Sequence, residues 1–91
     1  MSRIDIQRSH ALTPEEVHAA IDEIAQSLTA KYGVRCAWQG GVLDFSRPGV
    51  EGSITVTTHE VHLRARLGLA MRPFKPVIER EIERYLDQRL A

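Results

Sequence analysis

Apolar and polar residues alternate one by one in some stretches of this chain and recur with helical spacing in two others. At the start, Ile4 and Ile6 alternate with Arg3, Asp5 and Gln7. A period of two with one apolar side is typical of a strand that is buried on one face only. The pattern therefore predicts that the chain opens with a half-buried strand.

The stretch from Thr13 to Gly33 carries a full set of helix signals. Thr13 suits the N-cap, Pro14 suits the first helical position, and Glu16 completes a capping box. Gly33 supplies the left-handed residue that commonly follows a helix. Apolar residues recur at i, i+4, i+7 and i+11 to form one stripe: Val17, Ile21, Ile24 and Leu28. The stretch predicts an amphipathic helix.

From Val34 to Leu67 the period returns to two, which predicts four strands joined as two hairpins. Gly40 and Gly41 form the tight turn of the first hairpin, and residues 57–60 form the turn of the second. We expect Gly52 to interrupt its strand at a bulge or bend, because glycine often marks such a site.

The last stretch is helical from about Pro76, and its charged and apolar residues are sorted onto different sides. The apolar stripe consists of Phe74, Val77, Ile78, Ile82, Tyr85, Leu86 and Leu90. The other side mixes acids and bases, including the helix-stabilising pair Glu81 and Arg84. A membrane-surface helix carries mainly basic residues on its polar face, so this helix is expected to pack on the sheet.

Together these elements predict an α+β fold in the order β-α-β-β-β-β-α, forming a single domain over residues 1–91. Short turns between consecutive strands require antiparallel pairing. A single antiparallel sheet of about five strands, with one apolar face covered by two amphipathic helices, satisfies the pattern.

Composition limits the classes of function. Twelve basic and twelve acidic residues balance, which removes the simplest argument for nucleic acid and leaves little repulsion against a homodimer. The one cysteine, Cys36, excludes an intrachain disulfide and fits a reducing cytoplasm. Residues 1–10 do not resemble a secretory signal, and no apolar run approaches the ~18 residues of a transmembrane segment.

Residues that could support catalysis or bind metal are sparse. The stretch "THEVH" is one residue short of a zinc-binding H-E-x-x-H motif, and His59 and His62 are expected on opposite faces of a strand. His10 and His18 are interpreted as solvated or capping groups, and Cys36 as a small buried thiol. No enzyme, metal site or cofactor is predicted.

The segment from Leu67 to Phe74 is apolar and loop-like, and it has two interpretations. It either closes the core, which we favour, or presents an outward apolar surface formed by Leu69, Met71 and Phe74. Basic residues precede and interrupt it: Arg64, Arg66, Arg72 and Lys75. We interpret these as solvated charges on a strand face and edge rather than as an anion-binding patch.

Several stretches carry a family resemblance. They are "HAL" before the first helix, W-x-G in the first hairpin, F-S-R-x-G-V-x-G, and P-x-I-E-R-E-I-E-R-x-L in the last helix. With them, nearly the whole chain resembles the polyhydroxyalkanoic acid system family, small bacterial proteins often encoded near storage-polyester genes. The resemblance implies a setting in polyester storage, and it carries no catalytic residue across.

Three functions remain open. The first is an accessory protein that contacts a storage granule, a polymer-related ligand or a granule enzyme through the apolar segment and the basic residues around it. The second is a carrier of a small apolar ligand, with a pocket lined by Trp38, Phe45, Leu63 and Ile78. The third is a dimerising structural module.

Overall fold

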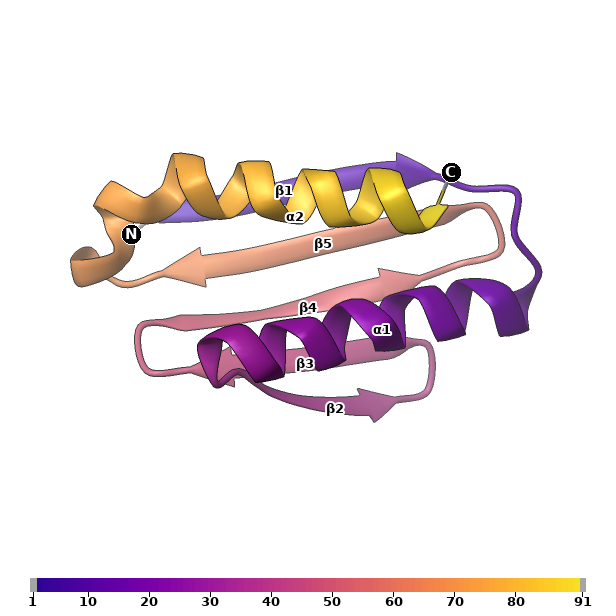
Figure 1. The fold of residues 1–91 in the computed structure, drawn as a ribbon, viewed down its shortest axis with the longest axis horizontal. Coiled ribbons are helices and arrows are strands. Elements are labelled where there is room, and N and C mark those ends of the chain that lie inside the picture. Colours follow the sequence, from indigo (N-terminus) through magenta and orange to yellow (C-terminus); the bar gives the residue numbers. More distant parts are fainter. Residues whose placement is uncertain (1, 91) are drawn as a thin grey trace.

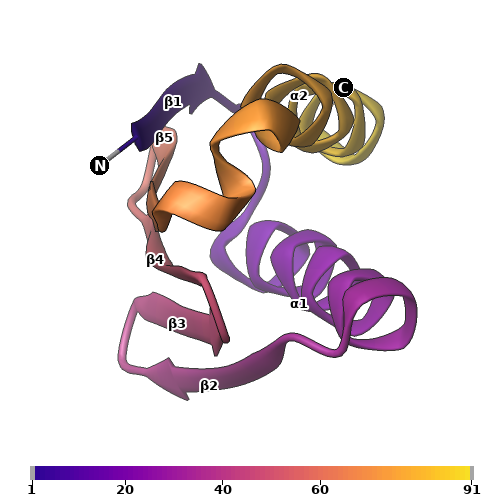
Figure 2. The same ribbon diagram turned by 90° about the vertical axis from the view of Figure 1, so that its left-hand side faces the viewer.

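Five strands form one antiparallel sheet, and two helices cover one of its faces (Figures 1 and 2). The computed structural model describes residues 2–90. The elements are β1 (Ser2–Ser9), α1 (Pro14–Tyr32), β2 (Arg35–Gln39), β3 (Val42–Arg47), β4 (Val50–Val56), β5 (Glu60–Leu67), the 3-10 helix η1 (Leu69–Phe74) and α2 (Lys75–Leu90). The predicted α+β fold and element order are confirmed.

The strand order is β1-β5-β4-β3-β2. Strands β2 to β5 pair with their neighbours in sequence, and β1 completes the sheet by pairing with β5. In that pairing Ile4 lies opposite Ala65 and Ile6 lies opposite Leu63. All four of these side chains are buried, so the apolar sides of the first and last strands combine into one surface beneath the helices.

Helix α1 begins and ends at the predicted signals. The Thr13 hydroxyl accepts a hydrogen bond from the Glu16 backbone N–H, and the Glu16 carboxylate accepts one from the Thr13 N–H. The hydrogen bond from the Thr13 backbone N–H is the main reason that the pKa of Glu16 lies below its ordinary value, and the Thr13 side chain lowers it further. Gly33 adopts the left-handed conformation at φ 67° and donates its N–H to the carbonyl of Thr29.

The core lies between the sheet and the helix layer. Figure 2 shows the sheet on one side of the molecule and α1 and α2 side by side on the other. Among the side chains with almost no exposure are Ile21, Ile24, Leu43, Ile54, Leu63 and Leu86. Helix α2 contributes only Ile82 and Leu86 as buried residues. The first residues of its apolar stripe, Val77 and Ile78, therefore remain exposed or half-buried.

The expectation of a bulge or bend at Gly52 is wrong. Strand β4 pairs without interruption on both sides, with Gly52 opposite Phe45 on β3 and Ala65 on β5. A Cβ atom at Gly52 would lie 2.2 Å from the Arg64 carbonyl oxygen, 2.8 Å from the Ala65 Cα and 2.8 Å from the Phe45 Cζ. Glycine is therefore required here because neighbouring backbone and an aromatic ring occupy the space of a side chain.

Trp38 faces α1 and fixes that helix to the edge of the sheet. Its indole N–H donates to the Asp22 carboxylate at 3.2 Å, and its ring stacks on His18 with the ring centroids 4.0 Å apart. Cys36 is half-buried on the same side, with its Sγ 3.9 Å from the carbonyl oxygen of Ala25.

Of the two positions expected for His10, solvated or capping, the solvated one is wrong, and the ring accepts a backbone N–H from the loop before α1. It is buried, with 8% of its surface exposed. Its Nδ1 accepts the Leu12 N–H at 3.2 Å, and its Nε2 lies 2.9 Å from the Thr57 carbonyl oxygen. A neutral ring with its proton on Nε2 satisfies both contacts, so this histidine connects the β1–α1 loop to the β4–β5 turn.

Candidate functional site

One end of the molecule combines segments that are distant in sequence. The C-terminus of α1, the β3–β4 turn, the end of β5, η1 and the start of α2 meet there, at the left of Figure 1 and toward the viewer in Figure 2. The large apolar side chains with the greatest exposure also belong to this end: Leu69 is 74% exposed, Val77 57%, Phe74 53% and Tyr32 37%. We call these four residues the apolar end.

A small cavity lies behind the apolar end, between the sheet and the two helices. Its volume is about 190 Å³. The lining is almost wholly apolar, with three polar exceptions, Tyr32, Arg47 and Glu81. The apolar lining residues are Leu28, Val34, Phe45, Val50, Ala65, Leu67, Met71, Phe74, Val77, Ile78 and Ile82.

Glu81 forms the centre of a polar cluster at the cavity wall. The Tyr32 hydroxyl donates a hydrogen bond to the Glu81 carboxylate. Lys31 and Arg84 also reach this carboxylate, at 3.4 and 3.6 Å. The hydrogen bond from Tyr32 is the main reason that the pKa of Glu81 lies below its ordinary value, and the same bond raises the pKa of Tyr32. The cluster fastens α1 to α2 next to the cavity.

Arg47 occupies the opposite, sheet side of the cavity. It is the last residue of β3 and follows Leu43 and Phe45 in the inward alternation of that strand. Its Nη1 donates to the carbonyl of Tyr32 at 3.0 Å, which satisfies a backbone group at the end of α1. Its Nε is buried and has no hydrogen-bond partner within residues 2–90, and no carboxylate in that range forms an ion pair with it.

The structure brings part of the predicted residue sets together at this cavity. Met71 and Phe74 from the apolar segment line it, and so do Phe45 and Ile78 from the predicted pocket. Leu69 lies outside the cavity on the surface. The segment forms η1 rather than a loop.

Trp38 and Leu63, the other two predicted pocket residues, do not line this cavity. Trp38 is engaged by Asp22 and His18 at the far edge of the sheet. Leu63 is fully buried in the core. The alternation of a strand indicates which side a residue faces, but it does not indicate where along that side a cavity opens.

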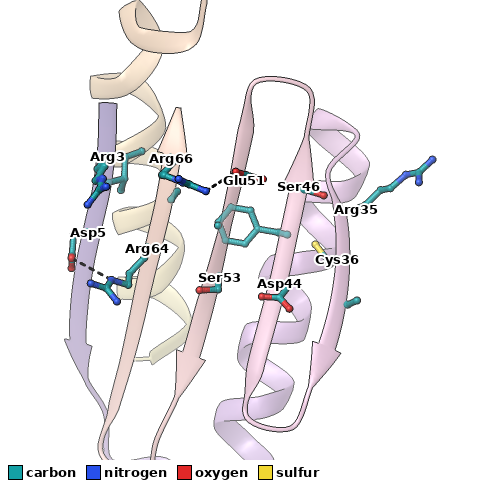
Figure 3. A pocket seen from close by; sticks show the side chains of 15 residues that line it. Arg3, Asp5, Arg35, Cys36, Asp44, Ser46, Glu51, Ser53, Arg64 and Arg66 are labelled. Atoms are coloured by element: carbon teal, nitrogen blue, oxygen red, sulfur yellow. Dashed lines mark hydrogen bonds and ion pairs between the residues drawn. The ribbon is translucent and has the colours of Figure 1, made fainter. Parts of the chain in front are cut away.

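Arg64 and Arg66 lie on the face of the sheet that the helices leave uncovered (Figure 3). They line a concavity of about 750 Å³. Arg66 pairs with Glu51 at 2.8 Å and Arg64 with Asp5 at 3.8 Å. Neither arginine lines the apolar cavity, because alternate residues of β5 point to opposite sides of the sheet.

The other two basic residues are nearer to the apolar end. Arg72 is exposed on η1, and Lys75 is half-buried at the start of α2, 3.6 Å from Glu79. His62 lies on the uncovered face 2.6 Å from the Asp5 carboxylate. Within residues 2–90, no three His, Cys, Asp or Glu side chains are placed to hold a metal ion.

None of the helices within residues 2–90 is long and apolar enough to cross a membrane.

Sequence reasoning missed Tyr32, Arg47 and Glu81. One signal was available for Arg47. It continues the alternation that turns Leu43 and Phe45 inward, and a cation at an inward position needs a hydrogen-bond or ionic partner. For Tyr32 and Glu81 no local signal exists, because 49 positions separate the two residues. Only the packing of α1 against α2 brings them together.

Fold and site together define a small α+β protein with one sheet face open to solvent and an apolar end beside a cavity. A family model described as "Putative polyhydroxyalkanoic acid system protein" matches residues 4–90. The chain belongs to this family, and the resemblance drawn from its sequence is confirmed. No curated protein and no solved structure matches the chain.

Proposed function

We propose that this chain is a non-enzymatic, cytoplasmic accessory protein of polyester storage that contacts the storage granule through its apolar end. The observation that carries the proposal is the exposure of Leu69, Phe74 and Val77 at one end of the molecule. Exposed apolar residues that gather on a small protein often mark an interaction surface. Membership of a polyhydroxyalkanoic acid system family supports a polyester as the surface contacted.

The charges of the molecule favour this end over the uncovered sheet face. On that face, Arg66 and Arg64 are paired with Glu51 and Asp5, so contact with an apolar polymer would require these charges to lose water. At the apolar end the three most exposed of the large side chains, Leu69, Val77 and Phe74, are hydrocarbon. Burial there is favourable at about 25 cal/mol per Å² of apolar surface.

The size of the cavity favours surface contact over the carriage of a large ligand. Its volume of about 190 Å³ is below the range of about 300–1,000 Å³ that is usual for small-molecule pockets. The competing proposal is that the apolar end is covered in a homodimer. Measurement of the oligomeric state in solution distinguishes this dimer from granule binding.

The test is co-sedimentation of purified protein with polyhydroxybutyrate granules. Leu69→Asp/Val77→Asp is the informative variant, because both side chains are more than half exposed and their replacement leaves the core intact. Met71 is unsuitable, since its Cγ lies 3.0 Å from the position of a Cβ on Gly49 and the side chain packs against that turn.

Ala19→Asp/Gln88→Asp is the matched control, because it adds the same charge at two other exposed helical positions. We expect the wild type and the control to sediment with granules and the Leu69→Asp/Val77→Asp variant, folded by circular dichroism, to stay in solution. Equal binding of all three proteins contradicts the proposal. A wild type that forms dimers and ignores granules supports the dimer instead.

A further inference from the structure

The cavity behind the apolar end combines an apolar wall with a cation that has no counter-charge. Arg47 lines it, and no carboxylate within residues 2–90 forms an ion pair with this guanidinium. The other charged lining residue, Glu81, is already neutralised by Lys31 and Arg84. The balance of charge at the cavity is therefore positive.

The donors of Arg47 are only partly used. Nη1 donates to the Tyr32 carbonyl at 3.0 Å, and Nε is buried with no partner within residues 2–90. Because Nε is closed to any atom the size of water, an anion in the cavity would be held by the Nη groups of this guanidinium. A guanidinium can present two parallel N–H donors to a carboxylate, and such bonds are stronger than those between neutral groups.

We propose that this cavity binds a free short-chain aliphatic carboxylate, with the carboxylate on the Arg47 guanidinium and the alkyl chain among Val50, Ile78 and the neighbouring apolar residues. The volume of about 190 Å³ holds about six non-hydrogen atoms, at roughly 30 Å³ for each atom of liquid-like size. That room corresponds roughly to a four-carbon acid when the two carboxylate oxygens lie inside the cavity, and to a six-carbon acid when the oxygens lie at its mouth on the guanidinium. The proposal deepens the candidate site but does not require granule contact, because the ligand is a soluble anion.

The experiment titrates the wild type with hexanoate and with hexanamide, and follows backbone amide shifts by two-dimensional NMR. The two probes have the same chain and nearly the same shape, but only hexanoate carries a charge. We expect hexanoate to bind with shifts centred on Arg47, Val50 and Ile78, and hexanamide to bind about tenfold more weakly or not at all, since it lacks the charge-assisted bond. Dodecanoate, too long for the cavity, is expected to bind less well than hexanoate.

Two variants separate the ligand site from a purely structural role of Arg47. Arg47→Gln removes the charge, and is expected to weaken hexanoate about tenfold while leaving hexanamide unchanged. Val50→Phe fills the cavity without changing any charge, and is expected to abolish the binding of both probes. If Arg47→Gln fails to fold, Val50→Phe and the comparison of the two probes in the wild type still decide the question.

Three results overturn the proposal: no shifts with millimolar hexanoate, equal affinity for hexanoate and hexanamide, or shifts that map to the uncovered sheet face. The last result would indicate a nonspecific anion site among the arginines of that face. Failure here leaves granule binding untouched, because granule co-sedimentation contains no short-chain acid. Conversely, failure of granule binding leaves the titration interpretable.

Discussion

Replacement of Gly52 by alanine tests how much the close packing of the three central strands contributes to stability. The new Cβ would lie 2.2 Å from the carbonyl oxygen of Arg64 and 2.8 Å from the Cα of Ala65. Both atoms belong to the backbone of β5, which is held between β1 and β4 by pairing on each side. The third contact, 2.8 Å from the Phe45 Cζ, involves a ring that is itself buried.

Overpacking of a core costs about 1–3 kcal/mol, occasionally more. Because two of the three contacts are with backbone atoms that cannot rotate away, we expect Gly52→Ala to lose about 3 kcal/mol, near the top of that range. In a domain of this size each kcal/mol corresponds to about 4–8 °C in Tm, so the expected fall is roughly 12–24 °C. Against a typical total stability of about 5–15 kcal/mol, this loss is large but leaves a folded protein.

The assay is urea unfolding followed by Trp38 fluorescence and by circular dichroism, from which the free energy of unfolding and the m-value are obtained. Gly68→Ala is the matched control, since Gly68 has an ordinary φ of −68° and the nearest atom to its new Cβ is 3.6 Å away. We expect the control to stay within about 0.5 kcal/mol of the wild type. A loss in Gly52→Ala no greater than in Gly68→Ala refutes the reasoning.

A second variant tests which contact matters. Phe45→Leu in the Gly52→Ala background removes the aromatic contact but not the two backbone contacts. We therefore expect the double variant to remain at least as unstable as Gly52→Ala alone. Recovery of stability would show that the ring, and not the β5 backbone, sets the requirement for glycine.

Two further predictions concern hydrogen bonds. Tyr32→Phe removes the hydrogen bond to Glu81. In the wild type this bond is the main cause of both the lowered pKa of Glu81 and the raised pKa of Tyr32. At pH 7 the free energy of unfolding of the wild type should therefore exceed that of the variant by about 1 kcal/mol. This difference should vanish in acid, as Glu81 is protonated, and again in alkali, as Tyr32 ionises. A difference in urea unfolding that does not change with pH would contradict this. His10→Ala leaves the Leu12 N–H and the Thr57 carbonyl without their partner. We therefore expect the free energy of unfolding, measured by thermal unfolding, to fall by about 2 kcal/mol. The exposed control His59→Ala should lose about 0.5 kcal/mol or less.

The sequence was most informative where a structural feature is local. Thr13, Glu16 and Gly33 fix both ends of α1 through hydrogen bonds that span three or four residues. The Gly40–Gly41 turn likewise fixes the first hairpin. In each case the residues that form the feature lie next to one another in the chain, so residue type and spacing are sufficient to predict it.

Features that depend on packing between distant elements could not be predicted. The pattern around Gly52 permits either a bulge or a regular strand, and the decision depends on the closeness of Phe45 and Ala65. The cavity depends on the distance between the start of α2 and the sheet. The spacing of apolar residues along the sequence does not determine this distance. For this reason two of the four residues in the predicted pocket, Phe45 and Ile78, line this cavity, whereas Trp38 and Leu63 do not.

The position of β1 in the sheet has a consequence for how the chain folds. Strands β2 to β5 pair with their neighbours in sequence, so each hairpin closes a short loop. β1 is synthesised before the other four strands, yet its partner β5 follows only after α1 and three other strands. Its pairing closes a long loop, which carries a larger entropic cost. Of the five strands, the one that precedes the others in the chain is therefore expected to join the sheet last, with its apolar side exposed until β2 to β5 have paired.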